Sequence, residues 1–276
     1  MKLLKNVLLL LTCSIFSLQA AGDYSEFITG KTHQEGYFSF YIDNETGKVY
    51  LEIDKSDEFL FQSSMPHGIG SNDLGLDRGQ LGAARLVQFE RVGDKVLLRQ
   101  KSTYYRANSD NELEKKAVRE AFASSIIWGF KVASKTDDGK KVLIDYTPFL
   151  LSDIHNISAK LKKRKEGNFK IDASRSAIYI ARTKSFPDNT ELEATVTYKG
   201  SGAGKYLRSV VPDSSAITVN LHHSLIKLPD DNYQTREFHP FSGFWAKSYA
   251  DYASDIDQPL IERVIPRHRL SKKDPT

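Results

Sequence analysis

Cysteine is nearly missing from this 276-residue sequence, because Cys13 is the only one and it lies in an apolar N-terminal segment. Once that segment is removed, the chain has no thiol, which excludes disulfides, thiolate metal sites and cysteine nucleophiles. Thr12 is a poor match to the small residue that precedes a lipidated cysteine. We therefore expect no lipid anchor at Cys13.

Long apolar runs and a dominant charge are also missing. Past residue 22 no run approaches the roughly 20 apolar residues of a spanning helix, so we expect no stable membrane span. The 39 Lys and Arg against 35 Asp and Glu give a net charge of only +4. Because nucleic-acid affinity depends on cations clustered on phosphates, this balance argues against a nucleic-acid partner.

The motifs of common enzyme classes are missing as well. None of the seven histidines belongs to a His-Glu-x-x-His zinc motif, and no Gly-x-Ser-x-Gly elbow occurs. Gly30-Lys31-Thr32 does not complete a Gly-x-x-x-x-Gly-Lys-Ser/Thr phosphate loop, because Ser25 stands where its first glycine would be. The adjacent pair His222 and His223 falls in an expected strand, where neighbours point to opposite faces and do not share a metal. We expect one of them to be buried and one exposed, and we expect no catalytic residue, metal or cofactor in this chain.

What is present begins with an export signal. Lys2 and Lys5 precede the apolar stretch Val7–Phe16, and the small residues Ala20–Ala21 follow it. This order is typical of a secretory signal peptide. We expect residues 1–21 to be cleaved, which lowers the net charge from +4 to +2 by removing both lysines. The mature protein is then expected in the periplasm, at the outer envelope or outside the cell.

Most of the remaining chain is typical of antiparallel hairpins. Aromatic and β-branched runs flank short loops containing glycine at 37–53, 85–101 and 132–144. Further strands are expected at 191–198, where apolar and polar residues alternate, and at 216–221. The predicted fold class is therefore α+β: a β-rich domain built from antiparallel hairpins with a few helices.

Two helices are expected. Ser109 and Glu112 have capping-box spacing, and apolar residues repeat at helical spacing from 113 to 126, before Gly129. The second helix is expected over Ser152–Lys165, and five of its last six residues are cations. A basic last turn suits the helix dipole, and a specific anion site is the alternative interpretation.

The most unusual stretch is Pro66–Gly79, in which glycine recurs. It carries the candidate functional residues Asn72, Asp73, Asp77 and Arg78. A loop held by its own Asn and Asp side chains is the ordinary interpretation. A partner or substrate contact, or calcium bound through oxygen, are the alternatives, although the spacing does not match a calcium loop.

Several stretches carry a resemblance to a family: Gly47–Ile53, Gly68–Gly79, Phe89–Leu98, Phe186–Glu191, His222–Leu225 and Arg267–Pro275. From about Gly36 to Thr276 the chain resembles the N-terminal, pre-catalytic region of bacterial exported zinc-dependent metalloproteases related to metzincins. One departure is His239–Phe244, which reads His-Pro-Phe-Ser-Gly-Phe, whereas the family more often has Asp-Pro-Arg-Ser-Gly-Tyr. A role tied to that Asp and Arg does not carry over.

The resemblance also implies a domain organisation. In relatives the zinc motif His-Glu-x-x-His-x-x-Gly-x-x-His lies in a separate domain that follows the sequence Lys-Lys-Asp-Pro, which is residues 272–275 here. Zinc is therefore expected only in that catalytic domain, which this chain lacks. We expect a signal peptide over 1–21, a β-rich accessory domain over 22–262 with a subdivision near 145–152, and a basic linker over 263–276.

Three functions remain open. The first is a non-catalytic accessory domain of a secreted zinc metalloprotease-like protein, here a truncated product, whose partner is the catalytic domain or another protein surface. The second is a stand-alone exported binding protein derived from that domain. The third is an enzyme that uses loop carboxylates such as Asp73 and Asp77.

Overall fold

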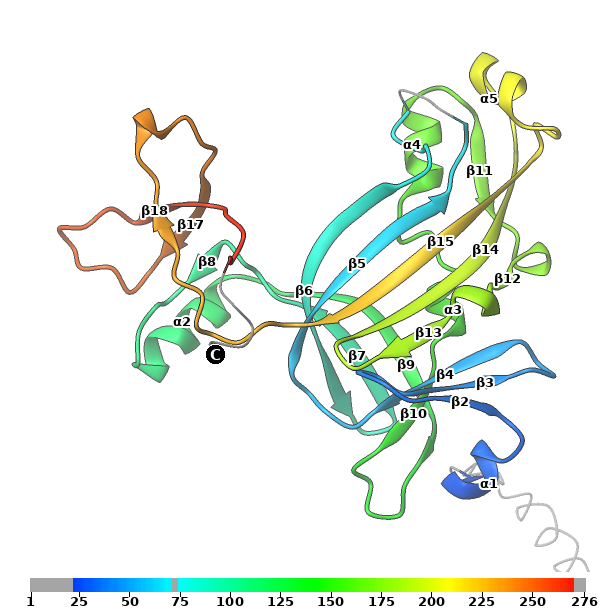
Figure 1. Ribbon diagram of the computed structural model, residues 1–276, viewed down its shortest axis with the longest axis horizontal. Coiled ribbons are helices and arrows are strands. Elements are labelled where there is room, and N and C mark those ends of the chain that lie inside the picture. Colours follow the sequence, from blue (N-terminus) through cyan, green and yellow to red (C-terminus); the bar gives the residue numbers. More distant parts are fainter. Residues whose placement is uncertain (1–21, 71–73, 271–276) are drawn as a thin grey trace, which may run out of the picture.

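The computed structural model describes residues 22–70 and 74–270, which form one large sheet and one small sheet (Figure 1). The expected signal peptide with Cys13, the loop residues Asn72 and Asp73, and the last six residues of the basic tail lie outside the described residues.

The large sheet contains 14 described strands. They are β1 (Gly22–Asp23), β2 (Thr32–Gln34), β3 (Phe40–Asp43), β4 (Lys48–Ile53), β5 (Glu58–His67), β6 (Gln80–Val92), β7 (Lys95–Gln100), β9 (Ser125–Lys135), β10 (Val142–Asp145), β11 (Asn168–Ile171), β12 (Ala177–Ile178), β13 (Lys184–Phe186), β14 (Asn189–Ser201) and β15 (Ala216–Lys227). The main path runs β11-β14-β15-β5-β6-β7-β9-β10-β4-β3-β2, and every pairing is antiparallel except that of β1 with β9.

The small sheet has the order β16-β18-β17-β8, with β8 (Tyr105–Arg106), β16 (Arg236–Glu237), β17 (Lys247–Asp251) and β18 (Ile261–Ile265). The helices within the described residues are α1 (Tyr24–Ile28), α2 (Glu112–Ala121), α3 (Thr147–Leu150), α4 (Ile157–Lys163) and α5 (Lys205–Val210). Three short 3-10 turns are η1 (Ala173–Arg175), η2 (Ile180–Arg182) and η3 (Pro240–Ser242).

The large sheet is strongly curved and nearly closed on itself. The N–H of Phe38 donates to Oγ1 of Thr190 on β14 at 2.9 Å, and the N–H of Tyr37 donates to the carbonyl of Phe186 on β13 at 2.7 Å. These bonds join the segment before β3 to the strands at the other end of the order. The β-branched and aromatic residues of the strands can therefore turn one face inward around a common core.

That core is rich in phenylalanine. Phe59, Phe61, Phe89 and Phe130 come from strands, while Phe149 of α3 packs against Phe61 and Phe130 with ring centroids 5.6 and 5.7 Å apart. Full burial of one such side chain contributes about 1.5–3 kcal/mol. Because α3 follows β10 directly, the chain at 145–152 is continuous with the core rather than a linker between two units.

The separated part of the molecule is the peripheral unit, which we define as residues 101–124 and 228–270. It contains α2 and the small sheet, and Figure 1 shows it set apart from the large sheet. Its two segments meet where Tyr105 pairs with Ala250 in parallel. The basic stretch expected to be a linker begins inside this unit, because Arg263 of β18 pairs with Ser248.

The three hairpins expected from the sequence are confirmed, as are the strands around 191–198 and 216–221, which lie in β14 and β15 and pair with each other. The first helix is wrong in its bounds, because Asn111 caps it and it ends at Ala121. Ile126 and Gly129 belong instead to β9, where they pair with β7. The second helix is shorter than expected and comprises only α4, since Asn156 adopts a left-handed conformation with φ of 58° before it.

Within the described ranges, none of the helices combines the length and the apolar character that crossing a bilayer requires.

Candidate functional site

The stretch Pro66–Gly79 is the glycine-rich loop, and its described part is anchored at both ends. Ile69 and Leu76 are buried, and the N–H of Ile69 donates to the carbonyl of Leu76 at 2.7 Å. Oδ1 of Asp77 accepts a hydrogen bond from Nε2 of Gln80 at 2.7 Å, and Arg78 is exposed. Asp77 therefore has the role of a turn-forming side chain, and the structure does not bring it together with another candidate residue among those it describes.

The adjacent histidines of β15 point to opposite faces, as expected. His223 is fully buried among the core aromatics, and its Nδ1 lies 3.2 Å from the hydroxyl of Tyr146. The expectation that its neighbour is exposed is wrong, because the side chain of His222 retains only 16% of its accessible surface. Two carboxylates on the paired strand cover it.

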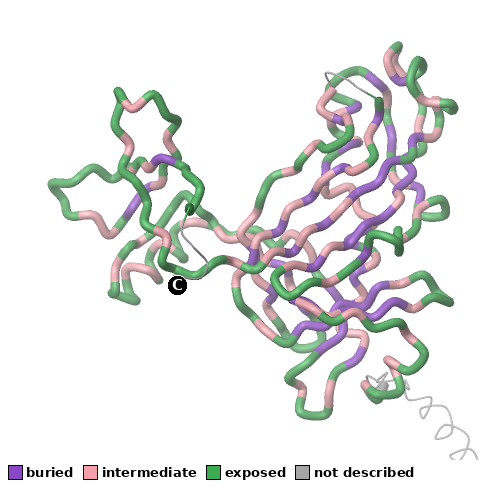
Figure 2. Tube along the Cα trace, in the orientation of Figure 1, coloured by how far each residue is buried: buried purple, intermediate pink, exposed green. Residues whose placement is uncertain are grey.

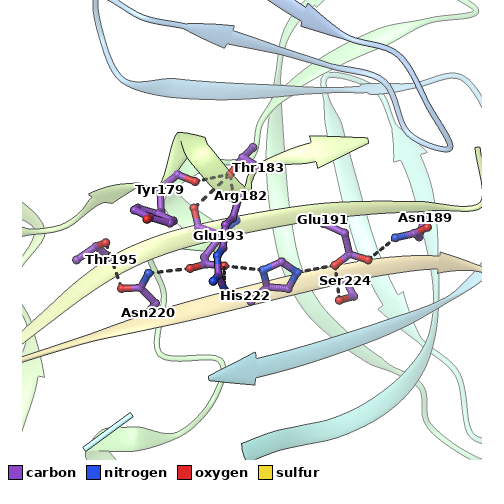
Figure 3. A network of polar contacts seen from close by, with 10 residues as sticks. All are labelled: Tyr179, Arg182, Thr183, Asn189, Glu191, Glu193, Thr195, Asn220, His222 and Ser224. Atoms are coloured by element: carbon purple, nitrogen blue, oxygen red, sulfur yellow. Dashed lines mark hydrogen bonds and ion pairs between the residues drawn. The ribbon is translucent and has the colours of Figure 1, made fainter. Parts of the chain in front are cut away.

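His222 is the centre of a polar row on the outer face of β14 and β15 (Figure 3). Its Nε2 lies 2.5 Å from Oε2 of Glu191, and its Nδ1 lies 3.1 Å from Oε2 of Glu193. Asn220 donates from Nδ2 to Glu193 at 2.7 Å, and Ser224 donates to Glu191 at 2.6 Å. Alternate residues of a strand share one face, so the register of the two strands assembles this row.

The carboxylates hold a proton on His222. Burial acts to lower the pKa of His222, but the hydrogen bonds and charges of Glu191 and Glu193 outweigh burial and raise it. Burial likewise acts to raise the pKa of Glu191, and hydrogen bonds from His222, Ser224 and Asn189 lower it on balance. With both ring nitrogens bonded, His222 has no lone pair for a metal or a substrate proton, so the row serves to join β14 to β15.

Two further histidines are buried and neutral. Burial lowers the pKa of His155 to about 4 and that of His223 to about 3. Nδ1 of His155 lies 3.5 Å from Oγ of Ser63, at the outer limit of a hydrogen bond, and both residues are buried. This serine and histidine do not form an accessible nucleophile and base. In the described ranges no group of three or more His, Cys, Asp or Glu is placed to hold a metal ion.

The peripheral unit exposes large apolar side chains. Phe241 and Trp245 retain 93% and 89% of their accessible surface, and little of this unit is buried in Figure 2. Others exposed on it are Leu113, Phe244, Tyr252, Ile256, Leu260 and Leu270. We call this set the apolar surface. Exposed aromatic groups of this kind mark protein contact sites more often than ordinary surface.

The apolar surface includes residues of the short turn η3, which begins after His239. His239 occupies the N-cap of η3, where its Nδ1 accepts a hydrogen bond from the N–H of Phe241 at 3.2 Å. An acceptor at the N-cap satisfies one of the free N–H groups of a helical turn, and the histidine nitrogen supplies it here. Phe241 adds apolar surface at this turn.

Sequence reasoning missed both the polar row and the apolar surface. Glu191 and Glu193 alternate with apolar residues, which signals an outward face. Only the register with β15 brings His222 between them. The sequence shows that aromatic residues are frequent in 238–245, but it does not show that they are exposed. They are exposed because few other residues of the peripheral unit pack over them.

The family model described as Domain of unknown function (DUF5117) matches residues 79–273, which is more than half of the chain and includes the whole peripheral unit. No curated protein and no solved structure matches the chain.

Proposed function

The chain belongs to the DUF5117 family of domains of unknown function, and we propose that it is a non-catalytic protein-docking module: the accessory N-terminal part of an exported zinc metalloprotease-like protein. The peripheral unit binds the folded catalytic domain, and the large sheet is the rigid support. The zinc and the chemistry belong to that partner. The protein acts outside the cytoplasm after loss of residues 1–21.

The observation that carries this proposal is the apolar surface. Phe241 and Trp245 are almost fully exposed on a unit whose described buried apolar residues are only Ala250 and Ile265. Such a unit gains little from its own core, and burying its aromatic side chains against a partner would stabilise it. Trp and Tyr at the centre of an interface contribute most to binding.

Charge also suits a protein partner rather than a lipid or nucleic acid. Arg267 and Arg269 line a hollow together with Phe244 and Leu270 of the apolar surface. Arg269 is already paired with Asp230, at 2.5 Å from Nη1 to Oδ1. The guanidinium of Arg267 faces the ring of Tyr233 at 5.8 Å and donates to the carbonyl of Gln234 at 3.0 Å. These cations are held within the unit, so the surface presents aromatic groups with a polar rim, as protein interfaces do.

The test is binding to a purified His-Glu-x-x-His domain from a relative whose sequence continues past the Lys-Lys-Asp-Pro point. We expect a complex by calorimetry, and we expect the double variant Phe241→Ser, Trp245→Ser to weaken it by about thirtyfold or more, which corresponds to about 2 kcal/mol. The control is Ile180→Ser with Phe186→Ser, two exposed apolar residues of the large-sheet body. Absence of a complex, or equal weakening by both double variants, would contradict the proposal.

A further inference from the structure

A basic pocket lies on the large-sheet body, away from the apolar surface. It has a volume of about 770 Å³ and lies between α4, β11, η1 and β14; α4 and β11 are neighbours in Figure 1. Four cations line it: Lys162, Lys170, Arg175 and Lys199. Ser158, Asn168 and Ser201 add hydroxyl and amide groups. Four separate elements therefore bring positive charge to one hollow.

The strand register places two of these cations against each other. Lys170 of β11 lies directly opposite Lys199 of β14. Like charges in such a cross-strand position destabilise a sheet. The adjacent pair on the same face is polar, Asn168 opposite Ser201. Lys199 has Asp172 as an ion-pair partner at 3.7 Å, whereas Lys170 has no ion pair among the described residues. An anion bound between the two lysines would relieve the remaining repulsion.

Nearby carboxylates neutralise only part of the charge. Oδ2 of Asp172 lies 3.0 Å from Nε of Arg175 and 3.7 Å from Nζ of Lys199. Asp213 contributes a second negative charge, which acts on Arg175. Within the described ranges, Lys162 and Lys170 make no ion pair. The four cations therefore outnumber the two carboxylates.

Asp172 positions Arg175 rather than blocking it. The side-chain hydrogen bond from Ser174, followed by Arg175 and Lys199, lowers the pKa of Asp172 to about 2, although partial burial opposes this. Arg175 uses Nε on Asp172, and its two Nη groups donate to no other described residue. A guanidinium fixed at Nε presents its remaining N–H groups in a fork that matches a phosphate or sulfate.

We propose that this pocket binds an organic polyanion that carries two or more phosphate or sulfate groups on a polyhydroxylated scaffold. A single oxyanion fills only a small part of about 770 Å³. The cations hold the anionic groups, and Ser158, Asn168 and Ser201 bond to the hydroxyls of the scaffold. The buried ring of Phe169 forms an apolar wall beside them.

The experiment is calorimetry on the mature chain with two probes, inositol hexakisphosphate and a sulfated heparin tetrasaccharide, and inorganic phosphate as the single-anion reference. We expect at least one polyanion to bind with 1:1 stoichiometry and much more tightly than phosphate. Binding of the first probe only identifies phosphate groups as the ligand chemistry, and binding of the second only identifies sulfate. Failure of both would overturn the proposal.

Substitutions distinguish a specific binding site from non-specific electrostatic attraction. Lys162→Gln, Lys170→Gln and Arg175→Gln should each weaken binding about tenfold or more. The matched control is Lys95→Gln with Lys131→Gln, two exposed lysines that face each other across β7 and β9. Equal loss in the control and in the pocket variants would overturn the proposal. A melting measurement without ligand adds an independent check, because Lys170→Gln removes the repulsion from Lys199 and should raise the melting temperature.

Discussion

Tyr105 and Phe122 are stacked face to face, with ring centroids 3.6 Å apart and ring planes within 3°. Tyr105 lies on β8 and Phe122 caps the end of α2, so the stack ties the two elements of the first peripheral segment together. Tyr252 of the second segment packs against both rings, at 6.3 and 5.2 Å. This aromatic group holds together the unit that carries the apolar surface.

Replacing Tyr105 with alanine should loosen the peripheral unit while the large sheet stays folded. An aromatic pair contributes about 0.5–1.5 kcal/mol beyond the area it buries, and this unit has little other core. We expect faster amide hydrogen exchange across 101–124 and 247–265, with strands β5 and β14 unchanged. Tyr179→Ala is the control, because that tyrosine has the same 36% exposure but lies outside the unit. Equal exchange in both variants would argue against the role of the stack.

The polar row should be most stabilising in mildly acidic solution. Folding raises the pKa of His222, so the contribution of this residue to the free energy of unfolding is complete below pH 6.5. It is lost as the pH rises through the folded-state pKa. Folding lowers the pKa of Glu191, so the contribution of this residue to the free energy of unfolding is present above pH 4.5. It is lost as the pH falls through the folded-state pKa. The window in which both act lies between these two reference values.

Glu193→Gln tests that row directly. It removes a buried charge while keeping the shape of the side chain, and we expect a loss of about 1–3 kcal/mol at pH 6. The pKa of His222, followed by NMR, should fall. Glu45→Gln, at an exposed turn, is the control and should change neither quantity. An unchanged pKa of His222 would contradict the assigned contacts.

The buried histidines should make the fold sensitive to acid. The pKa of His223 is about 3 and that of His155 about 4 in the folded chain, so the unfolded chain takes up protons first as pH falls below 6.5. The free energy of unfolding therefore decreases from pH 6.5 towards pH 4. His223→Phe should make this decrease shallower in urea titrations across the range. An unchanged slope in His223→Phe would contradict the buried, neutral state assigned to His223.

The glycine-rich loop gives a graded prediction. Gly70 and Gly75 both have positive φ, 66° and 73°, where an L residue costs about 1–2 kcal/mol. A Cβ at Gly70 would also lie 2.6 Å from the hydroxyl of Tyr206, whereas one at Gly75 would meet no atom within 4 Å. Gly70→Ala should therefore lower the melting temperature more than Gly75→Ala does. No change in either variant would count against a structural role for the loop.

The sequence predicts the strands well and their long-range partners poorly. The alternation of apolar and polar residues, such as Leu192 and Glu193, distinguishes the inward face of a strand from its outward face, and the short loops that contain glycine indicate the hairpins. The helical spacing up to Ile126 is misleading, because pairing with Arg99 of β7 stabilises a strand there. The peripheral unit depends on contacts such as Tyr105 with Ala250. No local pattern specifies that pairing, and it decides which side chains remain exposed.

The central claim is that the peripheral unit is the docking surface, and hydrogen exchange on the complex with a His-Glu-x-x-His domain tests it most directly. The account predicts that protection on binding is concentrated in 238–265 and around Leu113, and that the outer face of β14 and β15 is unchanged. Protection on the large-sheet body, with the segment around Phe241 and Trp245 exchanging as fast as in the free chain, would contradict it.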